Sequence, residues 1–351
     1  MKIKQTLASP LILAATTIAV LTPIGSHAFE AKLSGQVSRM IVVPDDAAGD
    51  EIQFVDIGWS GSRFRFTGSE TAENGIKYGF RFEIQARENS AGAPNGGTLG
   101  DTGDNQDNRY QDLYFSGDFG KVSFGKGDGA ANGSTEVDYS GTALSSAGAA
   151  IADNFGGYQI APGVAFKNVF RIDDALSRQN RIRYDTPDFN GFSLAGSLNQ
   201  GNSTEIAARY KGDFGGNKIG GAVFFATAAD KSATVDGNDI TGLSASLMLS
   251  GGLNFTVAYS QNEDSVDASK DREATFFKVG YKMGMHAVSV DFGQGEGDGS
   301  GSTEGDTAGL TYAVFPHKGV EMFATVRTLD SDGVANSQSV DILAFGSRIK
   351  F

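Results

Sequence analysis

The feature that most constrains this chain is a stretch of about ten residues, repeated many times, in which apolar and polar side chains alternate. The clearest example is residues 76–87. One face of it carries Tyr78, Phe80, Phe82, Ile84 and Ala86, and the other carries Lys77, Arg81, Glu83, Gln85 and Arg87. A period of two is typical of β-strands whose two faces meet different surroundings. The pattern therefore predicts an all-β protein.

The breaks between these stretches fall into two classes that alternate along the chain. The short breaks are residues 69–75, 118–120, 188–191, 212–216, 250–252, 283–284 and 315–318. The long breaks are residues 44–51, 89–107, 127–177, 201–203, 228–239, 262–272, 294–305 and 330–337. Together they separate about sixteen strands, an even number with short turns at one rim and long loops at the other, as in bacterial outer-membrane barrels.

The chemistry of the two strand faces favours a barrel in lipid over a soluble secreted β-protein, whose apolar faces would form a core. The polar faces carry many charges, which suits a water-filled interior. Lipid can cover the apolar faces only if every backbone group is paired within a closed wall. Aromatic residues at expected strand ends fit the girdles at the two membrane interfaces: Phe119, Phe189, Phe192, Phe214, Tyr259, Tyr281, Phe315 and Phe351. We expect a sixteen-stranded antiparallel transmembrane β-barrel.

Composition narrows the class of protein further. Glycine accounts for 48 residues and proline for only 7, which favours short strands joined by tight turns. Hydrophobic residues make up 40% of the chain without long runs, which argues against an ordinary helical membrane protein. A net charge of −13 argues against a nucleic-acid partner, because nucleic acids require a basic surface.

Residues 1–28 have the three parts of a signal peptide. Lys2 and Lys4 form a positive start, residues 11–21 form an apolar core, and Ser26-His27-Ala28 resembles a cleavage site. The apolar core is short for a transmembrane helix, so an uncleaved anchor is the weaker alternative. We expect residues 29–351 to be exported and to form the barrel without disulfides, since the chain has no cysteine.

The third long break, residues 127–177, is far longer than an ordinary connection between strands. It mixes carboxylates with apolar side chains, which are Ile151, Phe155, Tyr158, Ile160, Val164, Phe166, Val169 and Phe170. Such a segment can pack against a wall while it presents charge. We therefore expect it to fold inside the barrel.

Three segments resemble the Gram-negative general porins: residues 29–37 (Phe-Glu-Ala-Lys-Leu-Ser-Gly-Gln-Val), residues 62–68 (Ser-Arg-Phe-Arg-Phe-Thr-Gly) and the terminal Phe351. The resemblance implies an outer-membrane protein whose third long loop bends inward and narrows the pore. It also implies a homotrimer, and a role for Phe351 in recognition by the barrel-assembly machinery. A Pro-Glu-Phe-Gly-Gly motif frequent in that loop is missing, and only Asn154-Phe155-Gly156-Gly157 is similar to it.

Two groups of charged residues are the candidate pore constriction. The basic wall is Arg63, Arg65, Lys77, Arg81, Arg181 and Arg183, and the acidic loop is Asp128, Glu136, Asp138 and Asp153. If the two groups face each other, solutes cross a strong transverse field that sets selectivity. In the alternative, the arginines pair with Glu83, Asp112 and Asp185 and only hold the wall rigid.

Other candidate sites are weaker. Acidic outer loops, such as residues 45–51, 101–107 and 296–306, could bind divalent cations that bridge to lipopolysaccharide, although solvated loops are the simpler interpretation. We expect no tightly bound metal and no cofactor, since zinc spacing and EF-hand spacing are absent. Residues 125–130 fit G-x-G-x-x-A, but no βαβ unit surrounds them.

Catalysis has little support in this sequence. After processing only His286 and His317 remain, and no G-x-S-x-G elbow exists. We expect a passive, water-filled channel for ions and small hydrophilic solutes rather than an enzyme. Two alternatives stay open: a channel selective for one solute class, for example an anion such as phosphate, and a non-transport structural or adhesive barrel.

Overall fold

The computed structural model describes residues 29–45, 51–87, 105–228, 237–267, 270–297 and 303–351. The expected signal peptide, residues 1–28, lies outside this part of the chain, as do the centres of several long loops.

Strands make up most of the described residues. They are β1 (Glu30–Asp45), β2 (Gln53–Asp56), β3 (Arg63–Thr71), β4 (Lys77–Arg87), β5 (Asn105–Gly117), β6 (Gly120–Asp128), β9 (Arg178–Asp185), β10 (Phe192–Asn199), β11 (Ser203–Phe214), β12 (Asn217–Ala228), β13 (Asn238–Met248), β14 (Leu253–Asp264), β15 (Arg272–Met283), β16 (His286–Gly297), β17 (Glu304–His317), β18 (Val320–Asp332) and β19 (Val340–Lys350).

The inner loop, residues 129–177, joins β6 to β9 and has secondary structure of its own. It contains α1 (Ala143–Ser146), α2 (Gly148–Phe155), β7 (Gln159–Ala161), β8 (Val164–Ala165) and the 3-10 helix η1 (Phe166–Asn168). Within the described residues, no helix is long and apolar enough to cross a membrane.

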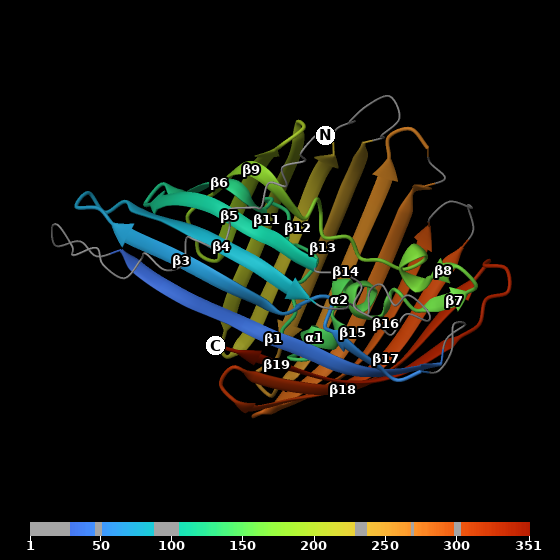
Figure 1. Cartoon of the computed structure of the whole chain (residues 1–351). Helices are drawn as coiled ribbons and strands as arrows, with labels where there is room; N and C mark the ends of the chain where they lie inside the picture. Colours follow the sequence, from blue (N-terminus) through green and yellow to red (C-terminus); the bar gives the residue numbers. More distant parts are fainter. Residues whose placement is uncertain (1–28, 46–50, 88–104, 229–236, 268–269, 298–302) are drawn as a thin grey trace, which may run out of the picture.

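The wall is a closed antiparallel barrel of 16 strands (Figure 1), as the alternation predicted. From β3 to β19 each wall strand pairs with its neighbour along the chain. The barrel is closed by β1, which pairs with β19 on one side and with β3 on the other. The last residue completes the seam, because Gly35 and Phe351 exchange two backbone hydrogen bonds of 3.0 and 3.1 Å.

The second expected strand is interrupted. Its first part, β2, pairs with β1 as far as Asp56 opposite Arg39, and its second part, β3, begins with Arg63 opposite Gln36. Six residues, 57–62, therefore stand opposite only two residues of β1. The extra residues leave the wall, and Trp59 contacts the inner loop through a backbone hydrogen bond to Asn154. We call residues 57–62 the inserted segment.

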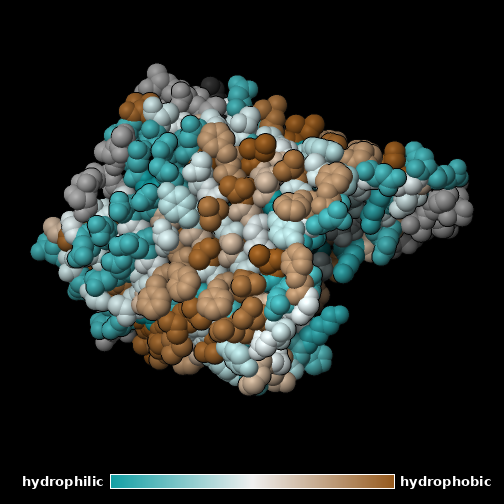
Figure 2. All heavy atoms as spheres, turned by 180° about the vertical axis from the view of Figure 1, so that it is seen from behind, coloured by the Kyte–Doolittle hydropathy of each residue, from teal (hydrophilic) through white to brown (hydrophobic). Residues whose placement is uncertain are grey.

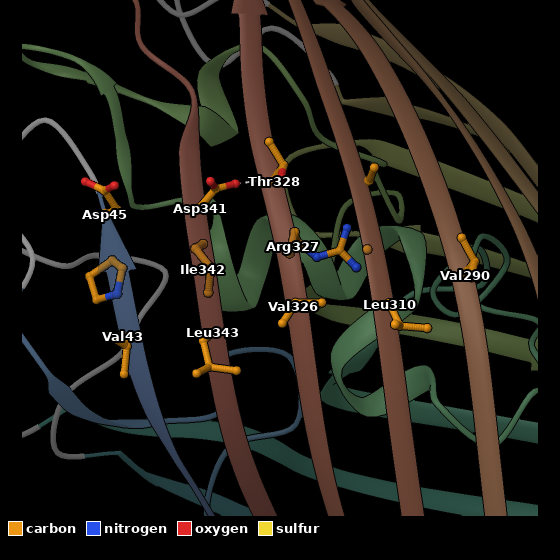
Figure 3. Close-up of a pocket in the computed structure, with 13 residues that line it drawn as sticks. Val43, Asp45, Val290, Leu310, Val326, Arg327, Thr328, Asp341, Ile342 and Leu343 are labelled. Atoms are coloured by element: carbon orange, nitrogen blue, oxygen red, sulfur yellow. Dashed lines mark hydrogen bonds between the residues drawn. The ribbon is translucent and has the colours of Figure 1, made fainter.

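The outer face of the wall is apolar and the inner face carries polar side chains, which is the reverse of the arrangement in a soluble protein. In β16, Val288, Val290 and Phe292 are exposed, whereas the alternate residues Ser289 and Asp291 are buried. Figure 2 shows a broad area of apolar side chains on the outer surface, bordered by hydrophilic ones. Figure 3 shows part of this surface over β16–β19 and β1, where Leu310 and Val326 line a shallow depression of about 790 Å³. Such an outer face is suited to lipid.

Short turns with exposed aromatic side chains form one rim. The turn between β9 and β10 has positive φ at Asn190 (55°) and Gly191 (91°), as a tight two-residue hairpin requires. Phe189 and Phe192 flank it, and both are about 60% exposed. Tyr259 departs from the expected girdle because it lies in the middle of β14, where its hydroxyl donates to Glu273.

The interior is not polar on all sides, contrary to the expectation from the strand faces. Apolar residues of the inner loop form a buried core with inward side chains of β1 and β15–β19; the largest are Phe155, Tyr158, Phe166, Phe170, Phe276, Phe323, Leu329 and Ile342. The loop covers this part of the wall, so the strands there bury apolar groups on the inside as well as exposing them on the outside. Another part of the wall, formed by β3–β6 and β9, carries the charged residues described below, and we call it the charged wall.

Candidate pore constriction

A cavity of about 970 Å³ lies between the inner loop and the charged wall, and we call it the passage cavity. Its basic lining residues are Arg63, Arg109, Lys167, Arg171, Arg178, Lys282 and Arg348. Its acidic lining residues are Asp107, Asp128, Glu136, Asp138, Asp153, Asp174 and Glu321. Of the predicted constriction residues, Arg63 and all four acidic residues are in this lining.

Four of the other predicted basic residues, all arginines, are engaged in the pairings that the sequence left open as the alternative. Arg65 Nε donates to Glu83 at 2.6 Å, and Arg183 binds Asp185 through its guanidinium. Arg81 and Arg181 both bind Asp112, with Nη2–Oδ2 distances of 3.1 and 2.8 Å. Lys77 lies with Arg81 on a separate cavity of about 510 Å³ towards the short turns.

Glu83 is the centre of the basic wall. Its fully buried carboxylate accepts hydrogen bonds from Arg65 and Arg109 and lies 3.5 Å from Arg63. One carboxylate therefore neutralises only part of three guanidinium charges, and the excess positive charge is fixed in place beside the cavity. Hydrogen-bonded ion pairs of this kind orient the side chains that make them.

Arg109 was missed from the sequence because the alternation changes phase in β5. The register between β4 and β5 shifts, with Glu83 opposite Tyr110 but Ile84 opposite Asn108, so Arg109 is an extra residue. A bulge of this kind redirects side chains. Both Arg109 and Tyr110 consequently line the passage cavity, although they are neighbours in the sequence.

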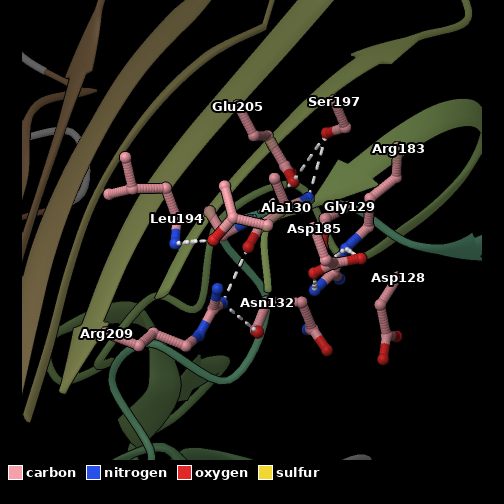
Figure 4. A network of polar contacts seen from close by, with 12 residues as sticks. Asp128, Gly129, Ala130, Asn132, Arg183, Asp185, Leu194, Ser197, Glu205 and Arg209 are labelled. Atoms are coloured by element: carbon pink, nitrogen blue, oxygen red, sulfur yellow. Dashed lines mark hydrogen bonds and ion pairs between the residues drawn. The ribbon is translucent and has the colours of Figure 1, made fainter. Parts of the chain in front are cut away.

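Arginines of the wall also hold the start of the inner loop. Arg181 donates to the carbonyl oxygens of Gly125 and Asp128, both at 2.9 Å, and Arg183 donates to Gly129 O at 2.6 Å. Further along, Arg209 donates to Ala130 O at 2.7 Å (Figure 4). Arg181 therefore holds the end of β6, from which the inner loop departs, and Arg183 holds the first residue of the loop.

Hydroxyl groups on the wall bind the backbone of the inner loop at intervals. Ser197 accepts a hydrogen bond from Ala130 N at 3.0 Å, and Ser260 accepts one from Asp173 N at 2.8 Å. Two serines of β13 do the same between these points: Ser244 binds Val137 N and Ser246 binds Tyr139 N, both at 3.0 Å. Glu205 adds two acceptors, for Ala131 N and Leu176 N. The loop is thereby fixed along strands from β10 to β14.

Asp138 points to the wall, although its residue also borders the cavity. Its carboxylate lies 2.5 Å from Lys278 Nζ, and both side chains are almost completely buried. Lys278 also donates to Ser146 O at 2.7 Å, next to α1. The pair attaches the helical part of the loop to β15, so Asp138 is an anchor and its charge is compensated.

The remaining acidic residues face the cavity from the loop side. Asp128 binds Tyr110 and lies 3.2 Å from Arg178 Nε, whereas Glu136 accepts a hydrogen bond from Trp59 Nε1 at 3.3 Å. Burial raises the pKa of Glu136 to about 8, and the nearby Asp174 carboxylate contributes to this increase. Burial also raises the pKa of Asp174.

Opposite charges thus border one cavity. Fixed guanidinium groups lie on β3, β5 and β9, and carboxylates lie on the inner loop and at the end of β6. Low-dielectric walls around such charges concentrate the electric field in the space between them. Because water and solutes can occupy this space, the arrangement is chemically suited to filtering solutes by charge.

Comparison with known proteins agrees with this geometry. The family model of the Gram-negative porins matches residues 15–334, so the chain belongs to the Gram-negative porin family. It is therefore an outer-membrane porin that forms a channel. No curated protein matches the chain significantly in sequence.

Solved structures share the fold at low sequence identity. An anion-selective porin from Comamonas acidovorans superposes with a TM-score of 0.66 at 18% identity, covering 92% of this chain and 100% of that one. The trimer form of OmpT from Vibrio cholerae gives 0.61 at 15% identity, with the same coverage. A mutant of the Rh. blastica porin gives 0.55 at 18% identity, again with that coverage.

Residues for other chemistry are sparse. The described residues contain no group of three or more histidine, cysteine, aspartate or glutamate side chains placed to hold a metal ion. His286 Nδ1 lies 2.6 Å from the hydroxyl of Tyr312, on the exposed face of the wall. Parts of the acidic loops considered for cation binding, residues 46–50, 101–104 and 298–302, lie outside the described residues.

Proposed function

We propose that this porin allows passive diffusion of ions and small hydrophilic solutes through the passage cavity. The observation that carries the proposal is the placement of unbalanced guanidinium groups around Glu83 opposite the carboxylates of the inner loop. A charged, water-accessible constriction admits hydrated solutes and disfavours apolar ones.

Single-channel recording tests this function directly. The purified protein is inserted into a planar bilayer, and conductance is measured with and without added solutes. Ohmic steps that solutes leave unchanged are expected. Absence of steps from folded, heat-modifiable protein would instead favour the structural or adhesive alternative.

A second candidate function is selective transport of anions. Arg63 and Arg109 border the cavity and share the single carboxylate of Glu83 with Arg65, and one structural neighbour is described as an anion-selective porin, which favours this candidate. A reversal potential in a salt gradient decides the sign of the selectivity. Saturating current that phosphate blocks would make the cavity a specific anion site and would contradict unselective diffusion.

The assembly of the protein is also a proposal. We infer a homotrimer, which the trimer form of the structurally similar Vibrio cholerae OmpT supports, and contact with lipopolysaccharide on the apolar outer face. Light scattering of the detergent complex before and after heating measures the subunit number. A monomer that conducts would contradict the trimer without affecting the channel proposal.

Export and insertion complete the proposal. We infer that residues 1–28 are removed on export, that the barrel-assembly machinery reads Phe351, and that the channel needs no cofactor and has no enzymatic activity. Mass spectrometry of the outer-membrane protein checks the first point, since an uncleaved product would retain residues 1–28.

A further inference from the structure

The inserted segment, residues 57–62, is a part of the interior that neither the sequence patterns nor the inner loop explain. It lies between β2 and β3, where the pairing with β1 is interrupted. Gly58, Trp59 and Ser60 all line the passage cavity. We propose that Trp59 and its segment form a second constriction element, which sets the width of the passage opposite the fixed inner loop.

The segment is held in place by side chains of the neighbouring wall strands. Gln36 Nε2 donates to the carbonyl oxygens of Ser60 and Gly61, at 2.8 and 2.9 Å. Arg348 Nη1 donates to Ser60 Oγ at 2.8 Å from the far end of the chain. Backbone groups that leave a sheet need such partners, and here both β1 and β19 provide them.

The segment also reaches the inner loop at close range. Trp59 N donates to Asn154 Oδ1 at 3.0 Å, at the C-terminal end of α2. A Cβ at Gly58 would lie only 1.9 Å from the backbone oxygen of Asp153, so only glycine permits this approach. The wall and the loop therefore meet across the interior at this point.

Trp59 borders the passage cavity and packs against the apolar core of the inner loop. Its Nε1 donates to Glu136 at 3.3 Å, while Arg63 begins the strand that follows the segment. The inner loop itself is fixed by the buried pair of Asp138 and Lys278 and by its apolar core. Width at this level consequently depends on the segment, whose largest side chain is Trp59.

Trp59 is the only tryptophan in the chain, so its fluorescence reports its position without any mutation. Folded protein in lipid vesicles is exposed either to acrylamide, a water-soluble quencher, or to brominated phospholipid. Quenching by acrylamide and not by brominated lipid is expected for an indole in the passage. The reverse result would overturn the proposal.

Conductance of variants tests the effect on width, which rests on the proposed diffusion function. Trp59→Ala is expected to raise the single-channel conductance about 1.5-fold or more, since conductance depends on the narrowest section. Trp59→Phe retains most of the ring and is expected to restore a conductance near that of the unaltered protein. The matched control is Phe64→Ala, which removes an exposed aromatic side chain from the outer face of β3 and should leave conductance unchanged.

The outcomes separate the two proposals. If the unaltered protein shows no steps, the diffusion function fails, while the quenching result still decides where Trp59 lies. If the unaltered protein conducts and Trp59→Ala conducts equally or less, the second constriction element is refuted and the diffusion function stands. Heat modifiability of each variant confirms that its barrel has folded.

Discussion

Asp138 of the inner loop and Lys278 of β15 form an ion pair of 2.5 Å in which both side chains are withdrawn from solvent. The pair lies behind the loop, where it attaches the segment around α1 to the wall. A residue that the charge pattern predicted for the constriction is therefore also an anchor of the inner loop.

Breaking this pair should loosen the loop. Asp138→Asn leaves the Lys278 ammonium buried without its carboxylate, so we expect a loss of about 3 kcal/mol in the free energy of unfolding in detergent. The exposed pair Lys211–Asp188 is the control, since Asp188→Asn should cost less than about 1 kcal/mol. Equal losses at the two sites would contradict the anchoring role. Unfolding by urea, followed by gel mobility, measures both.

The ion selectivity should depend on pH through Glu136. Its pKa of about 8 means that the carboxyl is mostly neutral below that pH and becomes charged as the pH rises through it. We expect the ratio of cation to anion permeability to increase between about pH 7 and pH 9. Because the pKa is raised from 4.5 to about 8, the folded loop keeps a proton that the unfolded chain has lost, so stability should fall as the pH rises from about 4.5 to about 8 and level off above that.

The variant Glu136→Gln identifies the titrating group. It should have nearly constant selectivity over this pH range, measured as the reversal potential in a salt gradient. Charged groups near Glu136 are Asp128, Asp153 and Asp174, and Arg63 and Arg178 also line the cavity. A pH dependence that survives in Glu136→Gln would assign the effect to one of these groups instead.

Two arginines should have different effects when they are replaced. Arg109 lines the cavity, so Arg109→Gln is expected to reduce the ratio of anion to cation permeability with a modest change in stability. Arg181 is almost completely buried between Asp112 and two carbonyl oxygens, so Arg181→Gln should lower the unfolding free energy by about 3 kcal/mol. Bilayer recordings and urea unfolding of both variants check this contrast. A stability loss in Arg109→Gln together with a selectivity change in Arg181→Gln would contradict it.

We expect Phe351 to have two roles. Its ring contributes to insertion into the outer membrane, and its backbone contributes to the closure of the barrel. Deleting Phe351 removes both backbone hydrogen bonds with Gly35 as well as the exposed ring, whereas Phe351→Ala removes only the ring. We expect the deletion to reduce the folded protein in outer-membrane fractions more than Phe351→Ala does. If refolding in detergent is normal for both and insertion in cells is equally poor, the ring alone is the signal.

Much of the wall could be predicted from the sequence by itself. Alternation in stretches such as residues 77–87, and the two classes of breaks, depend on local chemistry: each face of a strand meets either lipid or the interior. The number of strands, the closed antiparallel barrel and the length of the inner loop follow from these local rules. The charge pattern also predicted a group of constriction residues, of which Arg63 and all four acidic residues line the cavity, and their role in permeation stays a prediction.

Which charged side chains are free to face the passage cavity, and which are paired with other residues, was decided only by the tertiary structure. Arg109 enters the cavity because a bulge shifts its phase, and the carboxylate of Asp138 is paired with Lys278, which lies behind the loop on a strand far away in sequence. Trp59 depends on a contact with Asn154 across the interior. Pairing between residues distant along the chain is set by how the inner loop packs on the closed wall, and strand periodicity carries no information about that packing.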